Sequence, residues 1–160
     1  MRKECYFVYI HDMEGDMKFK KINQSQCHCI TLRRASNAIT EYYDAALQEV
    51  GLTTSQYSLL KNLGRLEMAS TSELAEQVNL DRSTLVRNLK PLLERGLIVD
   101  LAKENARNHQ FQVSETGMAL LEDANPRWQK AQDGIKAYLD KENVEMLMEM
   151  LYRLQELNTE

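Results

Sequence analysis

Apolar residues recur every three or four positions through most of the chain, the spacing of one face of an amphipathic α-helix. We therefore predict helices over residues 28–50, 54–66, 70–78, 82–94, 115–138 and 141–157. Two short stretches depart from this period: residues 97–101 are mostly apolar and residues 110–114 alternate, which indicates a two-stranded β-ribbon. The fold class is mainly α with a small β-ribbon.

Polar residues at the predicted helix starts support these boundaries. Ser70 and Glu73 have the spacing of a capping box, in which each side chain accepts a hydrogen bond from the other residue's backbone N–H. Asp81 follows a three-residue turn and can cap the next helix, and Thr54 or Ser55 can cap the helix over 54–66.

Glycine and proline mark where these helices end or bend. Gly51 and Gly96 follow predicted helices as stop signals. Pro126 lies inside the helix over 115–138 and should kink it, while Pro91 should only bend the helix over 82–94 near its end.

Composition limits the classes of protein that remain. The chain has 160 residues and a net charge of −4, and its acidic residues are concentrated after residue 115, so the middle can still present a basic face. No apolar run approaches the roughly 18 residues of a membrane span, so we expect a cytoplasmic protein that does not contact a membrane. Three cysteines without an export signal make no disulfide framework, and no cofactor motif is present.

The order helix, three-residue turn, helix, β-ribbon is that of a winged helix-turn-helix, whose second helix enters the major groove of DNA. Ser83, Thr84 and Arg87 occupy its first turns, where base contacts are usual, and the ribbon loop is basic. The full set of expected DNA contacts is Ser70, Arg82, Ser83, Thr84, Arg87, Asn88, Lys90, Lys103, Asn105, Arg107 and Asn108.

Two other classes of function stay open at this point. No glycine-rich phosphate loop, paired carboxylates or Ser/His/Asp motif is present, so an enzyme is disfavoured. A winged helix can also bind a protein partner, in which case its affinity would not fall steeply with salt as phosphate contacts require.

Several separated motifs resemble the MarR family of transcriptional regulators, and the resemblance spans residues 27–157. The matching stretches are residues 32–36, 51–53, 56–60, 72–75, 80–98 and 114–117. The resemblance implies a homodimer that binds a pseudo-palindromic operator and is a repressor released by an effector. It also implies that Arg107 enters the minor groove from the wing, although Asn105 stands where the family has aspartate.

This resemblance defines the expected organisation. Residues 1–26 form an N-terminal arm, residues 27–52 the first dimerisation helix, residues 53–114 the winged helix-turn-helix domain and residues 115–160 the C-terminal dimerisation helices. The apolar stripe from Val144 to Leu154 agrees with the dimer, because it is too apolar to be left in water.

Two kinds of signal input remain possible. The family commonly binds small aromatic or anionic effectors, for which Arg33, Ser36, Tyr57 and Trp128 are candidate lining residues. The alternative is thiol-based redox or metal sensing by Cys27 and Cys29 at the start of the first helix, although with His28 they supply only three ligands. The simpler alternative is that the cysteines are small apolar residues that pack at a dimer interface.

Overall fold

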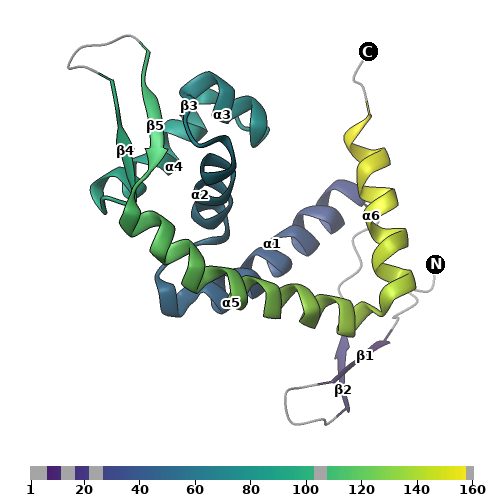
Figure 1. The fold of residues 1–160 in the computed structure, drawn as a ribbon. Helices are drawn as coiled ribbons and strands as arrows, with labels where there is room; N and C mark the ends of the chain where they lie inside the picture. The colour runs from purple at the N-terminus through teal and green to yellow at the C-terminus, as the bar shows by residue number, and fades with distance from the viewer. Residues whose placement is uncertain (1–6, 12–16, 22–26, 103–107, 158–160) are drawn as a thin grey trace. The chain divides into compact units, whose positions relative to one another are not determined.

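A computed structural model describes residues 7–11, 17–21, 27–102 and 108–157 of the chain. The chain divides into two compact units, Met1–Ile39 and Thr40–Glu160. In the first unit, strands β1 (Phe7–His11) and β2 (Met17–Lys21) pair antiparallel as a hairpin (Figure 1). The expected arm therefore contains regular structure, and neither strand is among the elements predicted above.

The predicted helices are confirmed with small changes at their ends. They are α1 (His28–Leu47), α2 (Thr54–Leu66), α3 (Thr71–Gln77), α4 (Arg82–Glu94), α5 (Glu115–Leu139) and α6 (Lys141–Gln155). A short 3-10 turn, η1 (Gln48–Val50), extends α1 and ends at Gly51, whose φ of 64° is a left-handed conformation that favours glycine. Helices α4 and α5 continue through Pro91 and Pro126.

The caps of α3 and α4 are those predicted, but the cap of α2 is not. Ser70 and Glu73 form the capping box of α3, and Asp81 caps α4. At α2 the cap is Thr53, which forms a capping box with Gln56: the Thr53 hydroxyl accepts from the Gln56 backbone N–H, and the Gln56 side chain accepts from the Thr53 backbone N–H. Thr54 is the first residue of the helix, and its backbone N–H and hydroxyl both donate to Asp44 of α1 at 2.6 Å, so the prediction of Thr54 or Ser55 was wrong.

The predicted ribbon is part of a three-stranded antiparallel sheet. Strand β5 (Gln110–Val113) lies between β4 (Ile98–Asp100) and the two-residue strand β3 (Ala69–Ser70), in the order β3-β5-β4. Ala69 pairs with Phe111, and both residues are buried. A two-residue strand is too short for an alternating pattern, which is why sequence analysis misses β3.

One leucine-rich core holds α2, α3, α4 and the sheet together. Its fully buried side chains come from every one of these elements: Leu60 and Leu63, Leu74, Leu85, Leu89 and Leu92, and Ile98. On the inner side of α4, Leu85, Leu89 and Leu92 are each at most 2% exposed, and Leu93 packs against the same core partly buried. Burial of this stripe fixes which side of α4 faces outward.

The start of α5 packs closely against the residues that follow α4. Ser114 caps α5 by accepting from the backbone N–H of Gly117, and its hydroxyl donates to the carbonyl of Gly96 at 2.6 Å. Gly117 lies so close to the neighbouring backbone that an added Cβ would be 2.0 Å from the carbonyl oxygen of Leu97. The sheet and α5 can meet in this way only because residue 117 has no side chain.

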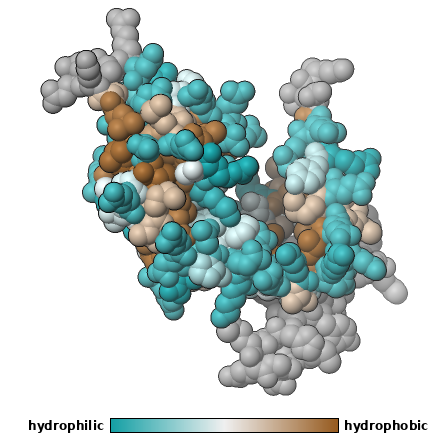
Figure 2. All heavy atoms as spheres, viewed as in Figure 1, coloured by the Kyte–Doolittle hydropathy of each residue, from teal (hydrophilic) through white to brown (hydrophobic). Residues whose placement is uncertain are grey.

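The apolar side chains of α6 are at most partly buried within the chain: Val144, Leu147 and Leu151 are half-buried and the others are exposed. None of its 15 residues is buried. Met146, Met150 and Tyr152 are each more than half exposed, at 55%, 53% and 59%, and Figure 2 shows apolar side chains between polar ones along this helix. In the part of the chain that the structure describes, no helix is long and apolar enough to cross a membrane.

The close approach at Gly117 gives a stability prediction. Gly117→Ala should lower the free energy of unfolding by about 1–3 kcal/mol, because the new methyl group overlaps backbone that cannot move easily. Gly64→Ala in α2 is the matched control: its Cβ would have no neighbour nearer than 3.8 Å, so it should stabilise by up to about 1 kcal/mol. Urea unfolding measures both, and an unchanged Gly117→Ala protein would contradict the close approach.

Candidate nucleic-acid interface

The outer side of α4 presents most of the predicted contact residues. With Leu85, Leu89 and Leu92 turned into the core, the residues exposed on the helix are Arg82, Ser83, Val86, Arg87, Lys90 and, at its last position, Glu94. Asn88 and Thr84 are half-buried at its edges. The Lys90 Nζ lies 3.7 Å from Glu94 Oε1, so the Glu94 carboxylate balances part of the Lys90 charge. Val86, 51% exposed, is absent from a set of contacts chosen by polarity, although a thymine methyl is an apolar feature of the major groove.

Asp81 organises the first turn of α4. One carboxylate oxygen accepts from the Ser83 hydroxyl at 2.5 Å and from the Thr84 backbone N–H at 2.9 Å, and the other accepts from the Thr84 hydroxyl at 2.6 Å. Hydrogen bonds from the Ser83 hydroxyl, then from the Thr84 hydroxyl and N–H, hold the pKa of Asp81 far below its ordinary value. Because both hydroxyls donate to Asp81, their oxygens are oriented to accept a hydrogen bond from a ligand.

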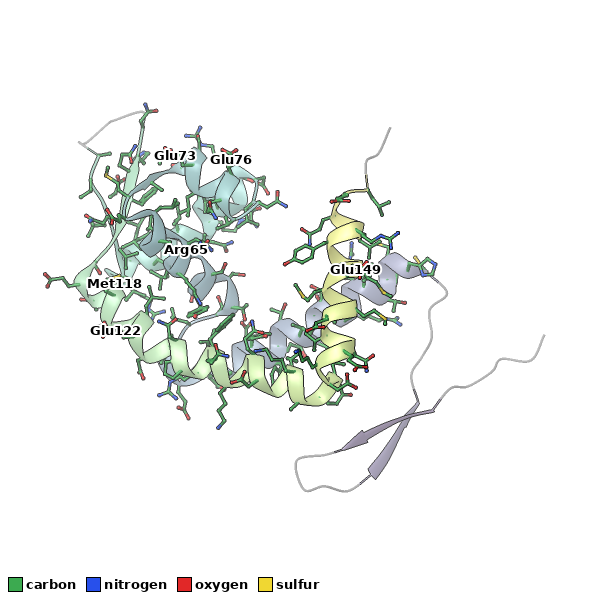
Figure 3. All side chains as sticks on the ribbon, turned by 45° about the vertical axis from the view of Figure 1, so that its right-hand side comes forward. Arg65, Glu73, Glu76, Met118, Glu122 and Glu149 are labelled. Carbon is green, nitrogen blue, oxygen red and sulfur yellow. The ribbon has the colours of Figure 1, made fainter. Side chains whose placement is uncertain are left out.

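A polar hollow joins α3, α4 and the sheet. Ser70, Arg82 and Asn108, three residues chosen from the sequence as contacts, line it together with Ser72, Glu73 and His109. Glu73 (labelled in Figure 3) accepts a hydrogen bond from the Ser70 backbone N–H, and this bond, followed by that of the Ser70 hydroxyl, lowers the pKa of its carboxyl. The Glu73 carboxylate is thus part of the cap of α3.

The base of the wing carries a pair that sequence analysis misses. His109 Nδ1 lies 2.5 Å from Asp100 Oδ2 across the two strands β4 and β5. Nine residues separate the two, so no local motif indicates the contact. Lys103, Asn105 and Arg107, the predicted contacts at the wing tip, lie outside the described residues.

Two of the four predicted effector-pocket residues are packed against each other. Tyr57 is 2% exposed and stacks on Trp128 with 5.7 Å between ring centroids. The Lys61 ammonium lies 4.1 Å from the Trp128 ring centroid and donates to the Tyr57 hydroxyl, which donates to Asn125. Lys61 is thus a cation beside this aromatic pair that sequence analysis did not single out.

The remaining candidates lie at the first half of α1. Arg33 and Ser36 are exposed there. Cys27 and Cys29 are also exposed, and no disulfide joins them. Within residues 27–102 and 108–157 and the two short strands, no three His, Cys, Asp or Glu side chains are grouped as a metal site would require.

Comparison with known proteins relates this arrangement to one family. The sequence model described as the MarR family matches residues 52–109, from the start of α2 to the wing. The organic hydroperoxide resistance transcriptional regulator of Bacillus subtilis (strain 168) is 30% identical over 108 residues, which cover 67% of this chain and 74% of that protein.

Solved structures show the same fold. The M. tuberculosis transcriptional regulator MosR, in complex with DNA, is 33% identical with a TM-score of 0.69, covering 82% of this chain and 97% of that one. A MarR variant from E. coli complexed with operator DNA has a TM-score of 0.71 and 18% identity, covering 79% of this chain and 91% of that one, so its likeness concerns the fold alone.

The Asp81 cap gives a pH-dependent stability prediction. Asp81→Asn should lower the unfolding midpoint by a few degrees at pH 7, because the variant loses a charge held by three hydrogen bonds. Since the folded pKa is depressed, this contribution is present above the unfolded pKa, about 3.9, and is lost as the pH falls through the folded pKa.

The midpoint difference between Asp81→Asn and wild type should therefore be largest near neutral pH and should shrink below about pH 4. Glu94→Gln, at the exposed far end of the same helix, is the control and should change the midpoint little at any pH. A difference that stays constant from neutral to acid pH would be inconsistent with the ionised cap.

Proposed function

This chain belongs to the MarR family of DNA-binding transcriptional regulators, and from that premise we propose that it acts as a homodimeric repressor of a pseudo-palindromic site. The observation that carries the proposal is the outer side of α4, where Arg82, Arg87 and Lys90 are exposed above a fully buried leucine stripe. In this arrangement α4 enters the major groove and its cations meet base edges and phosphates.

The polar residues in the first two turns of α4 have distinct roles in this docking. Arg87, in the second turn, offers a guanidinium fork that matches the two acceptors of guanine. Arg82, beside Ser70 and Asn108 in the polar hollow, is placed for the backbone phosphates that flank the groove. Ser83 and Thr84, whose hydroxyls donate to Asp81, offer acceptor oxygens that suit the amino groups of adenine and cytosine.

The homodimer is supported by apolar surface that the chain does not cover itself. α6 has no buried residue, and apolar side chains of α1, including Ile30 at 44% and Leu32 at 40%, are also exposed. Exposed apolar surface of this extent marks an interface. A two-fold dimer would present two α4 helices, so its binding site would be a palindrome with half-sites about one turn of DNA apart.

Two signals could release such a repressor. An anionic aromatic effector would find a cation and stacked rings at Lys61, Tyr57 and Trp128, although Tyr57 is already packed in the core. A thiol switch is the second candidate, favoured by the exposure of Cys27 and Cys29 and by similarity to a regulator named for organic hydroperoxide resistance. Measuring DNA binding before and after treatment with an organic hydroperoxide, and again after dithiothreitol, distinguishes the thiol switch from the small-molecule effector.

DNA binding is tested with duplexes that the protein selects from a random library. Arg87→Ala should weaken binding to the selected duplex about tenfold or more, because one bidentate base contact is lost. Lys130→Ala, which removes one exposed positive charge from α5, is the charge-matched control and should bind within about twofold of wild type. Fluorescence anisotropy at several salt concentrations measures both. Equal binding by Arg87→Ala and wild type would contradict the placement of α4 in the major groove.

The dimer is tested at exposed methionines of α6. The double variant Met146→Glu, Met150→Glu should sediment as a monomer of 18.6 kDa, whereas the wild type should sediment at twice that mass. Both side chains are more than half exposed, so the fold of the single chain should survive. Ala119→Glu, an exposed position in the first half of α5, is the control and should leave the dimer intact. A double variant that remains dimeric would exclude α6 from the interface.

A further inference from the structure

The Asp100 carboxylate joins the two strands at the base of the wing. Its Oδ1 accepts from the backbone N–H of Ala102 at 3.0 Å and of Gln110 at 3.3 Å, and its Oδ2 contacts the His109 ring at 2.5 Å. Partial burial would raise the pKa of Asp100, but the hydrogen bonds from Ala102, His109 and Gln110 together lower it. Asp100 is therefore an anion at neutral pH, bonded to residues on both sides of the wing loop.

The same contacts orient the His109 ring. The ring lies parallel to Phe111, at 9° with 6.1 Å between centroids, and Phe111 is a buried residue of the core. Because Nδ1 is held by Asp100, Nε2 is the only ring nitrogen left for a further partner. The side chain is 48% exposed and lines the polar hollow that also contains Arg82 and Ser70.

We propose that His109 is an ionisable phosphate-binding residue, positioned by Asp100, and that DNA binding takes up one proton there. The inference rests on the proposed DNA-binding function, because the hollow is where a backbone phosphate would lie beside α4. It adds a contact residue, His109, and a dependence of affinity on pH.

The proton follows from the tautomer that Asp100 selects. In a neutral ring, Nδ1–H donates to Asp100 and Nε2 carries a lone pair, which repels a phosphate oxygen. In the imidazolium, Nδ1–H still donates to Asp100 and Nε2–H donates to the phosphate, as a charge-assisted hydrogen bond. The proton comes from solvent, and no covalent bond changes.

The charges around His109 fix the direction of the effect. From β4, Asp100 favours the charged ring, and so does Glu73 from α3, whose carboxylate lines the same hollow. Arg82 from α4 opposes that charge but attracts the phosphate. An arriving phosphate adds a negative charge, so the bound complex favours imidazolium more than the free protein does, and affinity should fall as the pH rises through the range in which histidine titrates.

The test uses the selected duplex at constant ionic strength from about pH 6 to about pH 8. Wild-type affinity should fall by up to about tenfold across this range, as expected for loss of one charge-assisted hydrogen bond. His109→Gln should abolish the dependence and bind at all pH values about as wild type does at pH 8. His28→Gln, which removes a histidine from the start of α1, should keep the wild-type dependence.

Asp100→Asn tests the positioning residue separately. It should weaken binding at every pH, and it should move the midpoint of the remaining pH dependence to lower pH, because the imidazolium loses its anionic partner. A purely structural wing clamp would weaken binding without moving this midpoint, and that result would overturn the positioning role.

Calorimetry gives a second readout that does not depend on absolute affinity. Titrations at pH 7 in two buffers of different ionisation enthalpy should report proton uptake for wild type and none for His109→Gln. A wild type that binds the duplex with no pH dependence and no proton uptake overturns this inference and leaves the proposed function standing. A wild type that binds no duplex at any pH overturns both. Persistence of the full dependence in His109→Gln assigns the proton elsewhere and also overturns the inference.

Discussion

Burial of the leucine stripe on α4 is the constraint on which the rest of the interface depends. Leu85, Leu89 and Leu92 are each at most 2% exposed, and they pack against a core shared with α2, α3 and the sheet. Removing such side chains from water supplies most of the stability of a domain this size. Since a helix has only one inner side, the same burial turns Arg87 and Lys90 outward.

The leucine core orients α4 as a whole, and hydrogen bonds at the ends of helices and strands then orient individual side chains. Asp81 fixes the first turn of α4 and holds two hydroxyls with their oxygens oriented as acceptors. Asp100 has a comparable role at the wing, where one carboxylate accepts from the backbone of Ala102 and of Gln110, on either side of the wing loop, and contacts the His109 ring. In both places a carboxylate that does not itself face a ligand decides the orientation of groups that can.

Helices α1 and α6, near the two ends of the chain, have apolar side chains outside this core. Their apolar side chains find too few partners within the chain, and α6 buries none of its residues. A second copy that covered them would fix the spacing of the two α4 helices through the same contacts. A signal that alters those contacts would change this spacing, which is the physical basis for release of a dimeric regulator from a palindrome.

Local patterns in the sequence were sufficient for the helices and for the orientation of α4. Apolar spacing gave α2 and α4 at their observed bounds, and the Ser70–Glu73 and Asp81 caps depend on residues at most three positions apart. The family motifs are likewise contiguous stretches of sequence. Such features are visible because a helix repeats every few residues and its caps are local.

Only the tertiary structure decided the features that join distant residues. Asp44 of α1 meets Thr54 at the start of α2, β3 exists only because β5 pairs with it, and Lys61 meets Trp128 across two helices. The His109–Asp100 pair forms because β4 and β5 align antiparallel, which brings together two residues on either side of a loop. The sequence by itself therefore determined the helices and the outer side of α4, whereas chain folding decided which polar groups meet, since hydrogen bonds between distant segments leave no periodic trace in the sequence.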